Sequence, residues 1–99
     1  MTTWLITRHA GAREWANRHG FAADCVIAHL ESEAVVAAGD VVIGALPANI
    51  AARLCERGAR YLHLTLDLPF DMRGVELTAD DMDRLGARLE EIALQRVTY

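Results

Sequence analysis

The sequence predicts a three-layer α/β domain built on a mostly parallel four-stranded sheet in the order 2-1-3-4. Apolar runs of strand length alternate with segments of helical periodicity. Helices placed between strands imply right-handed crossovers and a parallel sheet that is covered on both faces. At 99 residues the chain is long enough for one hydrophobic core but not for two. We therefore expect residues 1–99 to form a single domain.

Composition and charge exclude several classes of protein. A hydrophobic fraction of 53% and a charged fraction of 24% are typical of a folded globule rather than a disordered chain. No apolar run is long enough to cross a bilayer and the N-terminus lacks the form of a signal peptide, so the cytoplasm is the expected location. A net charge of −4 argues against binding to long nucleic acid, but it allows a pocket for one small anion. Cys25 and Cys55 have no partner at metal or redox spacing and are interpreted as reduced core residues.

The first half of the chain supplies three of the predicted strands. Residues 3–9 begin as an apolar run and end in polar Thr7, Arg8 and His9. A short helix is predicted over residues 11–19, with Gly20 as its stop, and residues 24–30 form a second apolar run. Residues 31–39 are ambiguous, and the third strand covers residues 40–44.

The second half adds one strand between two helices. Pro47 suits the first position of a helix that extends to about Arg57, and residues 60–66 form the fourth strand. After an irregular stretch at residues 67–76, Thr78 and Asp81 predict a capping box at the start of the last helix. The inward stripe of that helix is expected to consist of Met82, Leu85, Leu89 and Ile92.

The predicted strand order places a ligand site at one edge of the sheet. Ligands of open α/β sheets bind beyond the carboxyl ends of the strands, where the strand order reverses. In the order 2-1-3-4 this point lies between strands one and three. Thr7, Arg8 and His9 should therefore lie beside residues 44–47.

The common cofactor and nucleophile signatures are missing from the sequence. It has no G-x-G-x-x-G, no phosphate-binding loop, no G-x-S-x-G and no lysine at all. Its four histidines do not fall at paired metal-ligand spacings. We therefore expect neither a cofactor nor a metal ion.

The remaining polar residues suggest a site for an anion. Arg8 can hold a phosphate with two hydrogen bonds, His9 can exchange a proton, and Asn49 and the first amides of the second helix can donate. Each feature has a structural alternative. Arg8 could pair with Asp67 or Glu14, His9 could merely start a helix, and Asn49 could be a solvated amide. His29 and His63 lie within apolar runs and are interpreted as core or rim groups rather than ligands. The roles of Asp67 and Asp71 stay open, and Arg73 and Glu76 could belong to a loop that closes over a ligand.

Three motifs carry a resemblance to a known family. They are T-W-L-I-T-R-H at residues 3–9, followed by Gly11, Ala12 and Trp15; G-D-V-V-I-G-A-L-P at residues 39–47; and R-G-A-R-Y-L-H-L-T-L-D-L-P at residues 57–69. With them the chain resembles the small ancillary proteins of type III CRISPR loci called the Csx-sixteen family. That family looks like a minimal relative of the CARF domains, which are Rossmann-like and bind cyclic oligoadenylate as dimers.

The resemblance implies a ring nuclease that opens cyclic tetra-adenylate without a metal ion and so switches off type III signalling. It also implies a homodimer that holds the ligand across its two-fold axis. We assign Arg8 and His9 as catalytic residues. The expected ligand-binding residues are Thr7, Arg13, Gly44, Ala45, Leu46, Pro47, Asn49 and Asp67.

Two other functions remain open at this point. The same basic crevice would serve a protein that sequesters or senses cyclic oligoadenylate without cutting it. A structural or protein-interaction module is the third reading, in which Arg8 and His9 affect neither binding nor turnover.

Overall fold

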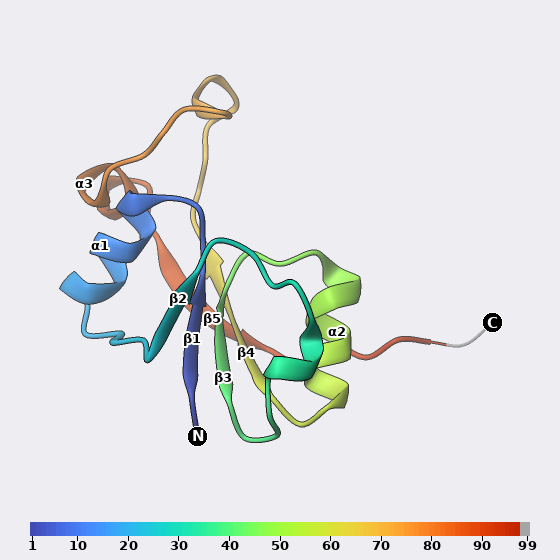
Figure 1. Ribbon diagram of the computed structural model, residues 1–99. Coiled ribbons are helices and arrows are strands. Elements are labelled where there is room, and N and C mark those ends of the chain that lie inside the picture. Colours follow the sequence, from blue (N-terminus) through green and yellow to red (C-terminus); the bar gives the residue numbers. More distant parts are fainter. Residues whose placement is uncertain (98–99) are drawn as a thin grey trace.

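A five-stranded sheet forms the centre of the molecule (Figure 1). The structure is a computed structural model and describes residues 1–97. The α/β class predicted from the sequence is confirmed. The elements in chain order are β1 (Thr3–Ile6), α1 (Ala10–Arg18), β2 (Cys25–Ile27), the 3-10 turn η1 (Glu33–Val35), β3 (Val41–Gly44), α2 (Ala48–Glu56), β4 (Arg60–Thr65), the 3-10 turn η2 (Phe70–Met72), α3 (Ala79–Arg84) and β5 (Arg88–Ile92).

The strand count and order differ from the prediction, because the sheet has a fifth strand and runs β2-β1-β3-β4-β5. The first four strands are parallel, and β5 pairs with β4 in the antiparallel sense. In register, Leu5 of β1 lies between Val26 of β2 and Ile43 of β3. The point where the strand order reverses is therefore next to β1, as the crossover argument requires.

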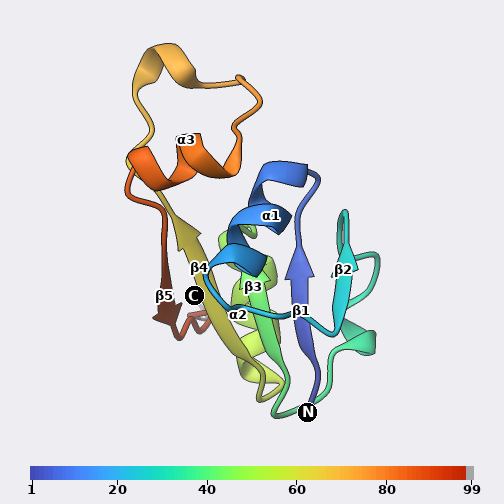
Figure 2. The same cartoon turned by 90° about the vertical axis from the view of Figure 1, so that its left-hand side faces the viewer.

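Helices cover both faces of the sheet, and two hydrophobic clusters fill the space between the layers. Helices α1 and α3 lie on one face, and α2 with η1 lies on the other (Figures 1 and 2). Strand β3 is buried along its whole length and serves both clusters. Val41 and Ile43 pack with α1 and α3, while Val42 packs against Leu54 of α2, as the two-residue period of a strand demands.

A polar network fastens α1 to α3. The carboxylate of Asp83 accepts hydrogen bonds from Trp15 Nε1 at 3.0 Å and from Arg18 Nη1 at 3.3 Å, and it contacts His19 Nε2 at 2.7 Å. The hydrogen bond with His19 is the main reason why the pKa of Asp83 lies below its usual value. Trp15 itself is a buried residue of the core.

The predicted length of the last helix is wrong. The capping box of Thr78 and Asp81 is present, but α3 ends at Arg84. Gly86 follows with φ of +72°, a left-handed conformation that glycine adopts without strain and that stops the helix. Leu89 and Ile92 therefore belong to β5 rather than to a helical stripe.

Smaller differences concern the ends of elements. Strand β2 is shorter than the predicted residues 24–30. Pro47 occupies the N-cap position of α2 rather than the first helical position, so Leu46 lies one residue outside the cap. No helix within residues 1–97 has the length and apolar character needed to cross a bilayer.

Candidate functional site

A cavity of about 660 Å³ lies where β1, β3 and β4 end, a volume in the usual range for small-ligand sites. Four segments surround it: the β1–α1 connection, the residues after β2, the β3–α2 connection, and residues 66–77, which join β4 to α3 and are called the 66–77 segment below. The lining residues are Leu5, Ile6, Thr7, Arg8, His9, Ala12, Ala28, His29, Leu30, Gly44, Ala45, Leu46, Pro47, Ile50, Leu64, Leu66, Leu68, Met72, Gly74, Val75, Glu76, Leu77 and Met82.

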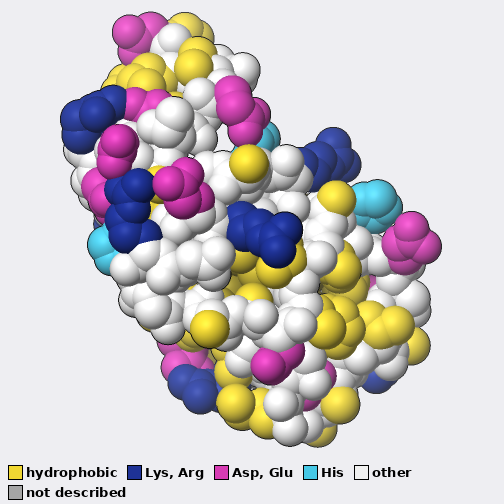
Figure 3. Space-filling view, turned by 60° about the vertical axis from the view of Figure 1, so that its left-hand side comes forward, with side chains coloured by type: hydrophobic (Ala, Val, Ile, Leu, Met, Phe, Trp, Pro, Cys, Tyr) yellow, Lys and Arg dark blue, Asp and Glu magenta, His cyan; other side chains and the backbone are white. Residues whose placement is uncertain are grey.

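Most of the cavity wall is apolar, and much of it comes from the 66–77 segment. This segment extends beyond the sheet at the upper end of the molecule, where the space-filling view shows hydrophobic side chains next to acidic ones (Figure 3). Val75, which lines the cavity, is 53% exposed. Such a wall favours a ligand that carries an apolar face as well as charge.

The β1–α1 connection supplies the polar rim. The Thr7 amide donates to the Ile27 carbonyl at 2.9 Å, which continues the pairing of β1 with β2 past the end of the strand. The Thr7 hydroxyl accepts from the His9 amide at 3.1 Å, and His9 is the N-cap residue of α1. The turn that holds Arg8 and His9 at the cavity is therefore fixed by hydrogen bonds on both sides.

Arg8 differs from most arginines of the chain. Arg18, Arg53, Arg60, Arg84, Arg88 and Arg96 each pair with a carboxylate. Arg8 lines the cavity, is exposed, and forms no ion pair with any residue in 1–97. Neither Asp67 nor Glu14 holds it, so its guanidinium is available to an anion.

The β3–α2 connection forms the opposite side of the cavity, with Gly44, Ala45, Leu46 and Pro47 all in the lining. A side chain at Gly44 would put Cβ 2.8 Å from the Ile6 carbonyl oxygen, which is closer than Cβ atoms approach. The bare backbone therefore lets the two connections lie side by side. No side chain caps α2, whose first turn begins beside the cavity.

The Tyr61 hydroxyl holds this connection from beneath. It accepts from the Leu46 amide at 2.9 Å, lies 3.2 Å from the Gly44 carbonyl, and lies 2.6 Å from His63 Nδ1. The hydroxyl has one proton, so all three contacts are satisfied when it donates to Gly44 and His63 Nδ1–H donates to it. Burial raises the pKa of Tyr61, which keeps the phenol protonated for this role.

The predicted site residues separate into two groups. Thr7, Arg8, His9, Gly44, Ala45, Leu46 and Pro47 line the cavity. Arg13 and Asn49 are exposed outside it. Asp67 is also outside it, and its carboxylate lies 3.7 Å from Arg88 Nη1 on β5.

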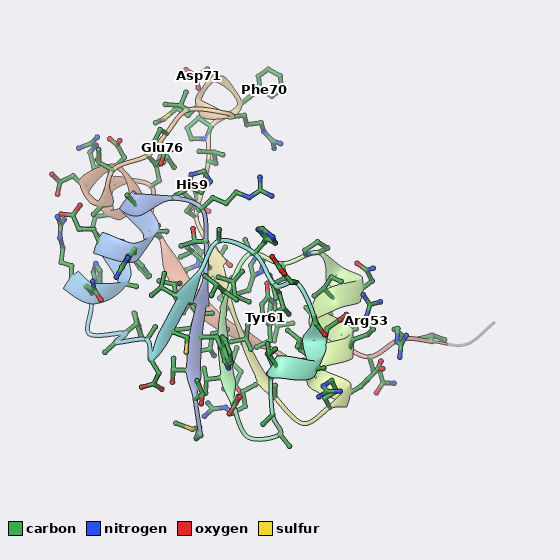
Figure 4. The ribbon with its side chains drawn as sticks, viewed as in Figure 1. His9, Arg53, Tyr61, Phe70, Asp71 and Glu76 are labelled. Carbon is green, nitrogen blue, oxygen red and sulfur yellow. The ribbon has the colours of Figure 1, made fainter. Side chains whose placement is uncertain are left out.

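Several lining residues were not among the expected site residues, although the rim was one of the two positions predicted for His29. His29 is 61% exposed at the rim, where its Nε2 lies 3.6 Å from Glu31 Oε1. Glu76 lies beside His9, and the two oxygens of its carboxylate are 3.3 and 3.1 Å from His9 Nδ1 (Figure 4). One signal in the sequence points to the lining residues of the 66–77 segment. In the run L-D-L-P at residues 66–69, the alternating leucines continue the strand pattern of β4, and both leucines line the cavity.

Within residues 1–97 no three histidine, cysteine or acidic side chains come together in a group that could hold a metal ion. The rim presents a guanidinium from Arg8, an imidazole from His9, a carboxylate from Glu76 and backbone amides. Such groups can bind a phosphodiester and move a proton.

Comparison with known proteins places the chain in a family. No curated protein and no solved structure matches it. Residues 4–95 match the model of a family described as "Putative CRISPR-associated protein (Cas_VVA1548)". Because this match covers most of the chain, the protein belongs to that family of CRISPR-associated proteins.

Proposed function

We propose that this protein binds cyclic tetra-adenylate at the cavity and opens its ring without a metal ion, which switches off type III CRISPR signalling. The observation that carries the proposal is Arg8, a cation with no ion-pair partner in residues 1–97, next to His9 at the mouth of a cavity. Membership of a CRISPR-associated family and the resemblance to the Csx-sixteen proteins supply the biological context.

The reaction would be attack by a ribose 2′-hydroxyl on the adjacent phosphorus. The bond from O2′ to phosphorus forms, the bond from phosphorus to O5′ breaks, and the products carry a 2′,3′-cyclic phosphate and a 5′-hydroxyl. His9 takes the proton of the attacking hydroxyl, and the leaving O5′ takes a proton from water. The imidazolium of His9 then returns its proton to water. Arg8 stabilises the charge that develops on the phosphoryl oxygens. The connections that hold both residues fix them for in-line attack.

A two-fold dimer would suit the symmetry of the ligand. Cyclic tetra-adenylate carries four phosphates in a ring that has a two-fold axis, so each protomer would engage half of it. One Arg8 and one His9 per protomer would then meet the ring from both sides. This doubling would bring two Arg8 guanidiniums to the ring, although each chain carries a net charge of −4.

The second candidate is a protein that sequesters or senses the same ligand without cutting it. The predominantly apolar wall favours this reading, because such a wall contributes to binding and not to proton transfer. Both candidates need Arg8, but only cleavage needs proton transfer by His9.

Chromatography of cyclic tetra-adenylate incubated with the protein and EDTA tests the proposal. We expect linear products that end in a 2′,3′-cyclic phosphate. His9→Ala should slow cleavage by roughly 10²–10⁴-fold, the usual contribution of general acid–base catalysis. Arg8→Gln should slow it by about 10²–10³-fold, as expected for the loss of one charge-stabilising donor.

Arg60→Gln is the matched control, since it also removes one arginine charge but at the far end of the sheet, where Arg60 pairs with Glu91. Its cleavage rate should equal that of the native chain. If the ligand is recovered intact but raises the melting temperature of the protein, the second candidate, binding without cleavage, is supported and the nuclease is refuted. No effect of the ligand on melting, together with no cleavage, would refute both.

A further inference from the structure

The contact between His9 and Glu76 joins two segments that are 67 residues apart in the sequence. His9 begins α1, and Glu76 lies in the 66–77 segment just before α3. Both oxygens of the Glu76 carboxylate lie within 3.3 Å of His9 Nδ1. Figure 4 shows the two side chains together, whereas Phe70 and Asp71 lie at the outer end of the segment.

This contact is too exposed to be important for stability. The His9 side chain is 62% exposed and that of Glu76 is 67% exposed. Exposed charged pairs contribute little to folding, because water screens them and both side chains lose freedom. A role in the chemistry of the rim explains the pairing better than a role in holding the fold.

The backbone on either side of the contact is held firmly. A side chain at Gly11 would collide with the carbonyl of Leu77, so α1 packs directly on the backbone next to Glu76. Thr78 then closes the capping box of α3. His9 and Glu76 are thus each within two residues of a packed contact, which is the support that a catalytic pair requires.

A carboxylate only accepts hydrogen bonds, so it selects the histidine tautomer whose proton is on Nδ1. In the neutral ring this leaves Nε2 without a proton and able to accept one. Because His9 lines the cavity, Nε2 is then the nitrogen available to a bound ligand.

We propose that Glu76 is a positioning residue that fixes the tautomer and orientation of His9, so that Nε2 acts as the base of the site. The proton of the ribose 2′-hydroxyl passes to Nε2 as the bond from O2′ to phosphorus forms. Nδ1 keeps its own proton and its hydrogen bond to Glu76, and the carboxylate stabilises the imidazolium. The catalytic use of this arrangement rests on the proposed ring nuclease, whereas the tautomer itself does not.

Nitrogen-15 NMR of the His9 ring, recorded at alkaline pH where the ring is neutral, tests the tautomer directly. The native chain should show the proton mainly on Nδ1. Glu76→Ala should give a mixture of both tautomers, while Glu76→Gln should largely restore the native pattern because its amide oxygen also accepts. Asp71→Asn is the matched control, since it removes a carboxylate from the same segment at a position remote from His9.

Cleavage of cyclic tetra-adenylate provides the second measurement. Glu76→Ala should lower kcat by about tenfold or more with little change in KM, because an orienting carboxylate acts on the base and not on binding. Glu76→Gln should fall between Glu76→Ala and the native chain, and Asp71→Asn should match the native chain. Equal melting temperatures for all four proteins would exclude a merely structural effect.

The two proposals fail in different ways. A His9 tautomer that does not respond to Glu76→Ala overturns the positioning role, whatever the cleavage assay shows. A tautomer that responds in a chain without nuclease activity upholds the pairing and refutes the proposed reaction. Native kcat in Glu76→Ala, despite an altered tautomer, overturns the use of Nε2 as the base.

Discussion

Polar side chains are buried and hydrogen-bonded at one end of the parallel strands, and exposed at a cavity at the other. At the amino end of the sheet, Asp40 is 4% exposed and its carboxylate is fully partnered. It accepts from the Thr2 amide at 2.9 Å, the Ala37 amide at 2.9 Å and Trp4 Nε1 at 3.1 Å. These bonds join the N-terminus, β1 and the residues before β3.

At the carboxyl end, the charged side chains face a cavity instead. Arg8 has no ion-pair partner in residues 1–97, and the one contact of His9 with a carboxylate is exposed. Beneath them, the Tyr61 hydroxyl satisfies the backbone of the β3–α2 connection. Within one sheet, the buried polar groups at the amino end thus support the fold, whereas the charged groups at the carboxyl end line an open cavity.

Asp40→Asn should have the largest effect on stability. The asparagine amide nitrogen cannot accept, so it would face at least one of the three donors that Asp40 now satisfies. We expect a clear drop in the free energy of unfolding, measured by urea denaturation. Ligand binding by the fraction that remains folded should be unchanged.

The pH dependence of that drop provides the control. Hydrogen bonds from the amides of Ala37 and Thr2 and from Trp4 hold the pKa of Asp40 below its ordinary value of 3.8. Its contribution to stability is therefore complete above that value and is lost as the pH falls through the lower folded-state value. The native chain and Asp40→Asn should converge in acid. A difference that stays constant with pH would contradict the role of the charge.

Tyr61→Phe should have an intermediate effect, because it removes one hydroxyl from beneath the cavity. Loss of its hydrogen bonds to the β3–α2 connection should cost about 1 kcal/mol of unfolding free energy. It should also weaken ligand binding, since the connection loses its support. Unchanged binding with unchanged hydrogen exchange at Leu46 would show that the hydroxyl does not hold the connection.

Arg8→Gln should have the smallest effect on stability. Its guanidinium pairs with no carboxylate in residues 1–97, so thermal unfolding should match that of the native chain. Arg53→Gln is the matched comparison, because half-buried Arg53 pairs with Glu33 and joins α2 to η1 (Figure 4). It should lower the melting temperature. A destabilised Arg8→Gln would mean that Arg8 is structural after all.

Much of the framework could be predicted because its signals are local. Three features can each be recognised within a few residues: the apolar run of β3, the capping box at Thr78 and the glycine that ends α1. Parallel crossovers then place the ends of β1 and β3 together. For this reason Arg8 and residues 44–47 could be placed at one site from sequence alone.

Strand β5 could not be predicted, because its pattern has two readings. Leu89 and Ile92 are three residues apart, which fits one face of a helix or opposite faces of a strand. The two residues lie on opposite faces of the sheet. Leu89 pairs with Leu64 and packs against the cluster of α1 and α3, whereas Ile92 pairs with Tyr61, whose other partner Val42 packs against α2. The spacing of Leu89 and Ile92 is therefore that of a strand, and Gly86 separates this strand from α3.

The pairing of His9 with Glu76 could not be predicted either, since nothing local records a contact between residues 67 apart. The irregular stretch gave no period from which the position of Glu76 could follow. The packing of Gly11 against Leu77, together with the contacts between α1 and α3, brings the two segments together.

The antiparallel return of β5 has an evolutionary consequence. Residues 66–87 leave the sheet at the end of β4 and re-enter it at once beside the same strand, so they form an excursion from the framework. Insertions and deletions in its irregular part, residues 66–77, leave every strand register intact and alter one wall of the cavity, whereas α3 is held in the core. Under the proposed function, relatives would adapt to rings of other sizes by changing the length of residues 66–77, and comparing that length with ligand preference across the family tests this.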